Sequence, residues 1–405
     1  SMARMSSDAA PPFRIRSLGL SVYLPTFLFA VGQGAVIPIL PLYATDLGAT
    51  LAIASLVVAL RNYGTMLFDI PAGILVSRFG ERGAMAIGTV ALAIVSIGAG
   101  LTNSILVLSL LVFVMGCGWS VWTLARLSYV SEAAPIEQRG RALSLLGGTN
   151  RIGNFVGPFA GGIGATVWGL ESAFYMQALF VSLGALTMFL LMKGDEGRED
   201  LHGEGIYQRF AGVLRENSGV FATAGVAMMA VQALRAARQV IIPLWGDQIG
   251  LDPAAIGAIV GLSFAIDMTL FYPVGIVMDR MGRKWVAVPC LLIMAVGTIA
   301  IPLTDSFTGL LIVALISGFG NGLGSGIVMT LGADFSPPTG RGEFLGVWRL
   351  IGDVGTAGGP TLISALTALM SLGAASIATG GLGLAGAAVM YFLVAEPLQR
   401  KPKPA

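Results

Sequence analysis

The sequence has few charged residues. Only 11% of its 405 residues are Asp, Glu, Lys or Arg, whereas 55% are hydrophobic, and the mean hydropathy is +0.81. Soluble globular proteins carry about 25% charged residues, which cover the surface that faces water. Because this chain has fewer than half that share, we expect most of it to lie in lipid.

Metal ligands and disulfide partners are also scarce. The chain has one histidine, His202, in a charged segment, and two cysteines, Cys117 and Cys290, each in an apolar run. Zinc sites and disulfide frameworks need several such residues at defined spacings. We therefore predict no metal, and we expect no cofactor and no nucleic-acid partner. Because the N-terminus is polar to about Ser17 and then enters a long apolar run, we also expect no cleavable signal peptide.

Apolar runs long enough to cross a bilayer recur along the chain. A spanning helix needs about 20 apolar residues. Such runs predict an all-α polytopic membrane protein with twelve transmembrane helices, at residues 17–44, 51–77, 84–102, 105–131, 142–166, 172–193, 219–245, 255–279, 284–304, 307–333, 343–370 and 374–395.

The basic residues indicate the orientation of these spans. With the N-terminus in the cytoplasm, 18 of the 24 Lys and Arg residues fall in inner segments, and the other six lie within spans. The outer loops hold no basic residue but do hold Asp46, Glu171, Asp247, Asp252 and Asp305. Because cytoplasmic loops are enriched in Lys and Arg, we expect a multi-pass protein of the plasma (inner) membrane with both termini cytoplasmic.

The two halves of the sequence repeat each other at a constant offset of 202 residues. Pro41, Gly73, Arg139 and Gly157 match Pro243, Gly275, Arg341 and Gly359. An even number of spans per unit makes this a parallel repeat, and transporters of this type bind substrate between the halves near the midplane. We predict two pseudo-symmetric six-helix bundles, at 1–193 and 219–405, joined by a cytoplasmic linker at 194–218. Two such halves favour alternating access over the fixed pore of a channel.

Glycine-rich motifs point to a family. The segments GILVSRFGER (73–82) and GIVMDRMGRK (275–284) resemble the two copies of the loop signature of the major facilitator superfamily. The segment GNFVGPFAGG (153–162) resembles the fifth-helix motif of its twelve-helix drug:proton antiporters. Ser77 departs from the usual Asp of the first copy. The residues that carry these motifs are Gly73, Arg78, Gly80, Gly275, Asp279, Arg280, Gly282, Gly153, Gly157 and Pro158.

The resemblance implies the major facilitator fold, in which helix 2 faces helix 11 and helix 5 faces helix 8. Helices 1, 4, 7 and 10 would line the cavity. An ionisable side chain inside a membrane is a functional hypothesis by default, and the fold brings several of them together. We predict two ion pairs between the halves, Asp69–Arg349 and Arg151–Asp267, that close the cytoplasmic side in one state. Asp353, one turn from Arg349, is an alternative partner, and the pairs could instead serve only to hold helices together.

Protonation of one acid would leave its arginine unpaired and favour separation of the halves. The residues that we assign to proton coupling and gating are therefore Asp69, Asp267, Asp353, Arg61, Arg151 and Arg349.

The cavity helices carry arginines rather than acids. On helix 7, spacings of three and four residues place Gln232, Arg235 and Gln239 on one broad polar stripe with Arg238. Arginine forks bind carboxylates and phosphates, so these residues favour an anionic or zwitterionic substrate. Alternatively, Arg235 and Arg238 pair with acids of neighbouring helices. The predicted substrate site comprises Arg235, Arg238, Gln239, Gln232, Gln33, Arg126, Asn62, Trp122 and Asn321.

These features together predict a secondary active transporter that couples export of a small amphiphilic compound to protons. The alternative is a carrier for an organic anion, zwitterion or lipid-like metabolite. We expect no enzyme, because no nucleophile or pair of acids clusters near one membrane interface, and no ATP-driven pump, because the chain lacks the motif G-x-x-x-x-G-K-[ST]. The expected partners are the substrate, protons and the lipid bilayer, and we expect a monomer.

Overall fold

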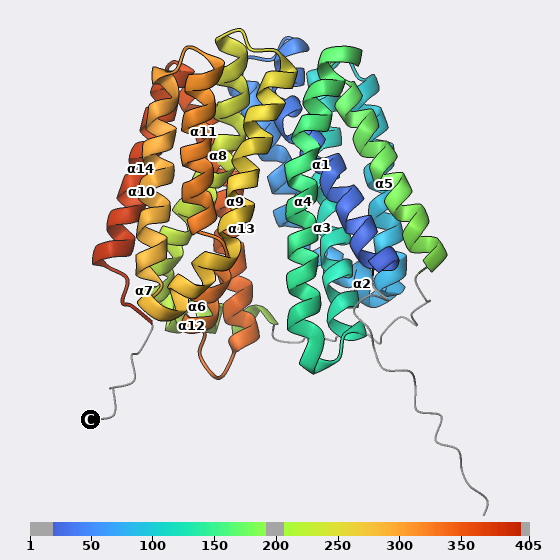
Figure 1. Ribbon diagram of the computed structural model, residues 1–405. Coiled ribbons are helices and arrows are strands. Elements are labelled where there is room, and N and C mark those ends of the chain that lie inside the picture. The colour runs from blue at the N-terminus through green and yellow to red at the C-terminus, as the bar shows by residue number, and fades with distance from the viewer. Residues whose placement is uncertain (1–18, 192–205, 398–405) are drawn as a thin grey trace, which may run out of the picture.

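The computed structural model describes residues 19–191 and 206–397, and all its regular elements are helices (Figure 1). Three of them are short π or 3₁₀ segments. In chain order the elements are η2 (Gly19–Tyr23), α1 (Leu24–Asp46), α2 (Leu51–Leu101), α3 (Ile105–Ala133), α4 (Ile136–Trp168), α5 (Ser172–Leu191), α6 (Ile206–Glu216), α7 (Ser218–Val220), η3 (Phe221–Gly225), α8 (Val226–Gln248), α9 (Pro253–Met281), α10 (Lys284–Ala300), η4 (Ile301–Leu303), α11 (Phe307–Leu323), α12 (Ile327–Phe335), α13 (Arg341–Thr367) and α14 (Leu372–Phe392).

The helices form two bundles that stand side by side. In Figure 1, α1–α5 make one bundle and α8–α14 make the other, and the bundles approach each other through α4 with α9 and α2 with α13. The start of α1, the end of α14 and the short helices α6 and α12 lie at the same end of the molecule, which we call the inner end (Figure 1). Residues 46–50, 102–104, 169–171 and 249–252 lie at the opposite, outer end.

Nine helices of the described chain are long and apolar enough to cross a membrane. One of them, the 51-residue α2, is interrupted at Gly80, whose φ of 70° and ψ of 170° are not helical. Because a residue without Cβ enters this region at little cost, the break agrees with separate spans at 51–77 and 84–102. The helices α4 and α13 are 33 and 27 residues long but less apolar. The all-α membrane fold is therefore confirmed, and the number twelve stays a prediction.

The tenth predicted span differs from expectation, because the sequence pattern predicts one helix at 307–333. In the structure α11 ends at Leu323 and α12 begins at Ile327. Between them Gly326 adopts a left-handed conformation with φ of 79°. The internal repeat breaks down here, since the matching segment of α3 around Trp122 is continuous. Five glycines at alternate positions from 318 to 326 explain the break, because glycine weakens a helix by about 1 kcal/mol relative to alanine.

Part of the predicted inner surface is not described. The linker residues 194–205, including Arg198 and His202, lie outside the described residues, and Ile206–Glu216 form α6. The predicted cytoplasmic termini also lie outside them, with Arg4, Arg14, Arg16, Arg400, Lys401 and Lys403.

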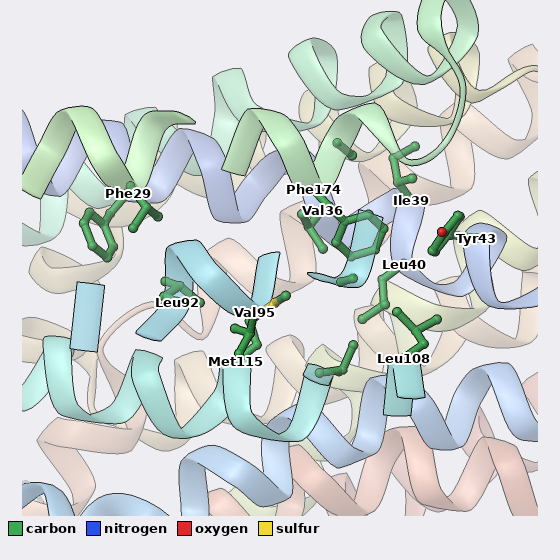
Figure 2. Packing of buried hydrophobic residues seen from close by; sticks show 14 of the residues in the cluster. Phe29, Val36, Ile39, Leu40, Tyr43, Leu92, Val95, Leu108, Met115 and Phe174 are labelled. Carbon is green, nitrogen blue, oxygen red and sulfur yellow. The ribbon is translucent and has the colours of Figure 1, made fainter. Parts of the chain in front are cut away.

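The outside of the bundles is apolar, as expected for a protein surrounded by lipid. Ile70, Leu106 and Leu190 expose 77%, 70% and 73% of their surface. Between the helices a core of close-packed side chains fills each bundle. Figure 2 shows the first of these, built from Phe29, Val36, Ile39, Leu40 and Tyr43 of α1, Leu92 and Val95 of α2, Leu108 and Met115 of α3, and Phe174 of α5.

Glycines allow the closest approach between the bundles. A Cβ on Gly162 of α4 would lie 2.5 Å from the Pro253 carbonyl oxygen of α9. A Cβ on Gly257 of α9 would collide with the Pro158 carbonyl oxygen of α4. Small residues let membrane helices pack backbone to backbone, so the two halves are in tight contact along the outer parts of α4 and α9.

Candidate functional site

The first group of charged residues joins α2 and α13. Arg349 Nη2 lies 2.8 Å from Asp69 Oδ2 across the interface, and Arg349 Nε lies 3.7 Å from Asp353 Oδ2 one turn along its own helix. Ser120 of α3 also donates a hydrogen bond to Asp69. Both partners that the sequence offers to Arg349 are therefore in contact with it, and the shorter contact is the one between the halves.

The second group joins α4 and α9. Arg151 Nη1 lies 3.6 Å from Asp267 Oδ1 and donates to Ser325 Oγ at 2.8 Å. Its guanidinium also stacks 4.3 Å from the ring centre of Phe271. The second cross-half pair that the sequence predicts is thus also present, and its role in gating stays a prediction.

Asp267 has further partners near the break between α11 and α12. Asn321 Nδ2 donates to Asp267 Oδ2 at 2.8 Å, and Ser325 Oγ lies 3.5 Å from Asp267 Oδ1. Ser325 therefore bridges Arg151 and Asp267. Asn321 is among the site residues predicted from the sequence, whereas Ser325 is not. The run of glycines around Ser325 was the available signal for it.

Arg235 of α8 binds the same break from the other side. Its Nη2 donates to the Gly324 carbonyl oxygen at 2.7 Å and lies 3.5 Å from that of Asn321, while Nη1 donates to Gln232 Oε1 at 3.0 Å. Gln232 Nε2 in turn donates to Thr356 Oγ1 of α13 at 3.4 Å. Arg235 thus uses backbone carbonyls, rather than an acid, as acceptors.

The remaining arginines of the predicted site are not all in one place. Arg238 is 4% exposed, donates to Ser263 Oγ at 3.2 Å and lies 5.4 Å from the ring centre of Phe264. It thus faces α9, while Arg235 faces α11.

The two glutamines of the predicted site, Gln33 and Gln239, are half-buried on α1 and α8. The Gln33 Oε1 atom is buried without a hydrogen-bond partner among the described residues.

Arg126 and Trp122 lie elsewhere, inside the N-terminal bundle. The Trp122 ring stacks on Phe29 at 3.9 Å between centroids, and the Arg126 guanidinium lies 4.1 Å from the Trp122 ring centre. Both residues are buried among α1, α2, α3 and α5. Trp122 and Arg126 therefore pack within the N-terminal bundle, whereas Arg235 and Arg238 belong to α8, and their grouping in one substrate site stays a prediction.

Four membrane arginines have no acidic partner in the described part of the chain. No Asp or Glu oxygen among those residues lies within 4.0 Å of the guanidinium of Arg61, Arg126, Arg235 or Arg238. The alternative that Arg235 and Arg238 form ion pairs with neighbouring acids is therefore not what the structure shows. The interior keeps an excess of positive charge.

Polar contacts between the halves continue toward the outer end. Asn62 Nδ2 donates to the Thr356 carbonyl oxygen at 3.0 Å, which places Asn62 at the α2–α13 interface. Tyr63 and Thr361 share a hydrogen bond of 3.1 Å, and the Ala254 amide donates to Thr166 Oγ1 at 3.0 Å. With the glycine contacts of α4 and α9, these bonds hold the outer parts of the two bundles together.

A cavity of about 590 Å³ opens at the outer end, where α1, α4, α8 and α9 meet. Acidic residues from both halves line it, namely Asp46, Glu171 and Asp247. Acids at the outer end and arginines inside the membrane give the molecule a marked charge asymmetry along its long axis.

The loop motifs form a network at the inner end of the second half. Arg283 Nη1 lies 3.8 Å from Asp279 Oδ1, and Arg283 Nε lies 2.7 Å from Asp334 Oδ2. The Glu396 carboxylate accepts the backbone N–H groups of Arg283 and Lys284, each at 2.9 Å, at the start of α10. Neither Glu396 nor Asp334 is among the site residues predicted from the sequence. For Asp334 a signal was available, because the 202-residue offset aligns it with Glu132.

The other motif residues fit the same picture. Gly80 and Gly282, with φ of 70° and 116°, form the turns after the second and eighth spans. Arg280 lies in the last turn of α9, and Arg78 lies beside Phe79. A Cβ on Gly73 would lie 3.9 Å from Leu124 Cδ2, whereas a Cβ on Gly275 would have no atom within 4 Å.

A Cβ on Gly157 would lie 2.5 Å from the Val31 carbonyl oxygen, so the α4 motif of Gly153, Gly157 and Pro158 allows α4 to pack against α1.

Comparison with known proteins identifies the family. The family model for the Major Facilitator Superfamily matches residues 22–238 and 220–405, that is, both halves. The chain belongs to the Major Facilitator Superfamily. It is therefore an integral membrane transporter rather than an enzyme, and transport of a small molecule is its general activity.

Several relatives within the Major Facilitator Superfamily cover most of the chain. An uncharacterized transporter of Methanocaldococcus jannaschii is 20% identical over 82% of this chain and 87% of its own length. The multidrug resistance protein MdtH of Enterobacter sp. is 24% identical over 85% of this chain and 86% of its own. A solved POT family transporter in complex with a thioalcohol-conjugated peptide has a TM-score of 0.79, 13% identity, and coverage of 93% and 95%. At that identity the solved structure supports the fold alone.

Proposed function

We propose that this protein exports a small amphiphilic compound in exchange for protons, by alternating access between its two halves. One observation carries the proposal: the carboxylates of Asp69 and Asp267 both lie in ion pairs that cross the interface inside the membrane region. A carboxylate can take up a proton, whereas arginine stays charged. Protonation would therefore remove an attraction between the halves without adding one elsewhere.

The contacts suggest how such a cycle would run. The outer halves of α4 and α9 are in close contact through Gly162 and Gly257, and in Figure 1 the bundles lie farther apart toward α6 and α12. In our proposal this conformation is closed to the outside, and opening of the outer side requires rupture of these contacts together with both ion pairs. The ion pairs would then stabilise the outward-closed state, instead of closing the cytoplasmic side as we predicted from the sequence. A proton that enters from outside and binds Asp69 or Asp267 would favour that rearrangement. Relatedness to MdtH, a protein named for multidrug resistance, supports export.

Transport by the purified protein in proteoliposomes tests the proposal. An imposed proton gradient should drive accumulation of at least one compound from a panel of cationic, neutral and anionic amphiphiles. Asp69→Asn and Asp267→Asn should each abolish gradient-driven accumulation while exchange down a substrate gradient continues. Gradient-driven transport that survives in both variants would refute the coupling role of these acids. Asp305→Asn serves as a control, since Asp305 is exposed in the loop between η4 and α11 and belongs to neither ion pair.

The proposal includes the placement of the chain in the cell. We propose that the inner end faces the cytoplasm with both termini, in the plasma (inner) membrane, that the halves are 1–193 and 219–405, and that the monomer transports. The charge distribution supports this, because the outer loops hold acids and the inner segments hold 18 of the 24 basic residues. Reporter fusions after residues 103 and 305 should report an outside location, and fusions after residue 403 an inside one.

A second candidate is transport of an organic anion. The observation that favours it is the group of buried arginines without acidic partners, of which Arg235 and Arg238 lie in the C-terminal half near the interface. A carboxylate or phosphate would supply the missing negative charge. Arg235→Gln and Arg238→Gln should then weaken binding of anionic compounds by about 1.5–3 kcal/mol each, as measured by titration calorimetry. Unchanged binding of neutral and cationic compounds in the same variants would separate this effect from misfolding.

A further inference from the structure

The break in the tenth span places a non-helical segment, residues 324–326, beside the ion pair between α4 and α9. We call this segment the joint. We propose that Arg235 is a positioning residue, which holds the α11–α12 break and thereby sets the partners of Asp267. Through this contact, the state of Arg235 in one half is transmitted to the ion pair that joins the halves. The inference rests on the proposed function for its role in transport, but its structural part can be tested without transport.

At the break, backbone hydrogen bonds of turn spacing replace the helical pattern, and Arg235 adds a side-chain donor. The backbone amide of Ser325 donates to the Gly322 carbonyl at 3.0 Å, and that of Ile327 donates to the Gly324 carbonyl at 3.2 Å. Both bonds have the three-residue spacing of a turn. The Asn321 and Gly324 carbonyl oxygens both face Arg235 Nη2. The Gly324 carbonyl also accepts from the Ile327 amide, so Arg235 gives it a second donor and gives the Asn321 carbonyl a longer contact of 3.5 Å. Because backbone polar groups in a membrane have no water as a partner, these contacts stabilise the broken form of the helix.

The residues that flank the break are the ones that bind Asp267. Asn321 is in the last turn of α11 and donates to Asp267 Oδ2, while Ser325 is in the break and bridges Asp267 to Arg151. If residues 324–326 became helical, the Ser325 side chain would rotate with them, whereas Asn321 already belongs to α11. The carboxylate of Asp267 would then lose Ser325, which bridges it to Arg151, and would keep Asn321 and Arg151.

The local packing fits a joint that is held by contacts rather than by its own backbone. A Cβ on Gly324 would lie 2.5 Å from Cys290 Sγ and 2.6 Å from Arg235 Nη2. Cys290 of α10 is fully buried against this segment, and its thiol lies 3.8 Å from Met294 Sδ. Cys290 is therefore a native reporter, because movement of the α11–α12 segment would uncover its buried thiol.

The experiment measures alkylation of Cys290 by N-ethylmaleimide in the purified full-length protein, with Cys117 replaced by serine. Arg235→Gln should accelerate alkylation about tenfold, because local opening of the joint is no longer opposed by the guanidinium. Arg238→Gln is the matched control, since Arg238 is a more deeply buried arginine of the same helix that binds Ser263 instead. Its rate should stay within about twofold of the parent. Equal rates for Arg235→Gln and the parent would overturn the proposal.

A second measurement separates positioning from loss of folding. Arg235→Lys keeps the charge but cannot span two carbonyls in the geometry of a guanidinium fork, so its alkylation rate should fall between those of the parent and Arg235→Gln. All variants should elute as a single symmetrical peak in size exclusion. If Lys restores the parent rate fully, charge alone suffices and the positioning role is wrong.

The link to transport is tested by a double-mutant cycle on the rate of exchange down a substrate gradient, which the Asp variants retain. Effects of Arg235→Gln and Asp267→Asn should be strongly non-additive, because both act on one network. Effects of Arg235→Gln and Asp69→Asn, which belong to separate groups, should add. Additivity in both cycles would overturn the link. Should Asp69→Asn and Asp267→Asn leave proton-driven transport intact while Arg235→Gln exposes Cys290, the proposed function fails and the positioning role stands.

Discussion

Arg349 of α13 is shared between two carboxylates, Asp69 of the opposite half at 2.8 Å and Asp353 of its own helix at 3.7 Å. The contact across the interface is the shorter one, and Asp353 is placed to receive the arginine when the halves separate. The arginine would then exchange one acid for another without passing through an unpaired state, which lowers the cost of the movement.

Asp69→Asn should shift the protein away from the conformation described above. The side chain of Arg349 is 51% exposed, so the lost contact should cost about 1 kcal/mol, or about a fivefold change in population. Spin labels at positions 103 and 248, on opposite halves at the outer end, should show a larger share of long distances. Asp353→Asn should leave that share unchanged or lower it. The same shift in both variants would contradict an exchange between the two acids.

Gly257→Val should block closure of the outer side. Because a Cβ at this position collides with the Pro158 carbonyl, the side chain must separate α4 from α9, at a cost of about 1–3 kcal/mol. Transport should fall by about tenfold or more, and the same spin labels should report increased separation. Gly381→Val on the exposed side of α14 is the control, since no atom lies within 4 Å of its added Cβ. Equal transport in both variants would show that the contact is dispensable.

Glu396→Gln should lower thermal stability. The carboxylate accepts two backbone N–H groups at the start of α10 at 2.9 Å each, and hydrogen bonds to charged groups contribute about 1.5–3 kcal/mol. Differential scanning fluorimetry in detergent should show a lower Tm than for the parent. Glu343→Gln, in the first turn of α13, is the comparison variant and should cause a smaller loss. An unchanged Tm in Glu396→Gln would mean that the loop is held by other contacts.

Trp122→Ala should act on stability rather than on substrate affinity. Trp122 is 1% exposed and stacked between Phe29 and Arg126, and Trp→Ala in a packed core costs about 3–5 kcal/mol. We expect a strong decrease in Tm and, for Trp122→Phe, near-normal binding of the transported compound. Trp285→Ala provides the control, because Trp285 is 64% exposed. Selective loss of binding with an unchanged Tm would instead support a place for Trp122 in the substrate site.

The charge pairs were accessible from sequence because they depend on depth and helix order. Asp69, Arg349, Arg151 and Asp267 each interrupt an apolar span, and the resemblance to a known fold supplies the facing helices. The arrangement of Arg126 was not accessible in this way. Its position along the span suits a cavity, but the direction of the side chain depends on how α3 is rotated against α1, α2 and α5, and packing around Trp122 decides that rotation.

The sequence by itself determined that the protein is an α-helical membrane protein made of two related halves, because scarcity of charge, the length of the apolar runs and the offset of 202 residues are properties of the chain alone. Tertiary structure decided where the tenth span breaks and what fills the break. Helix propensity marks the glycines around Gly324 only as weak points of the helix. The guanidinium of Arg235, from another helix, donates to the Gly324 carbonyl and stabilises the break. Such a contact depends on the positions of two helices in space, which local sequence does not specify.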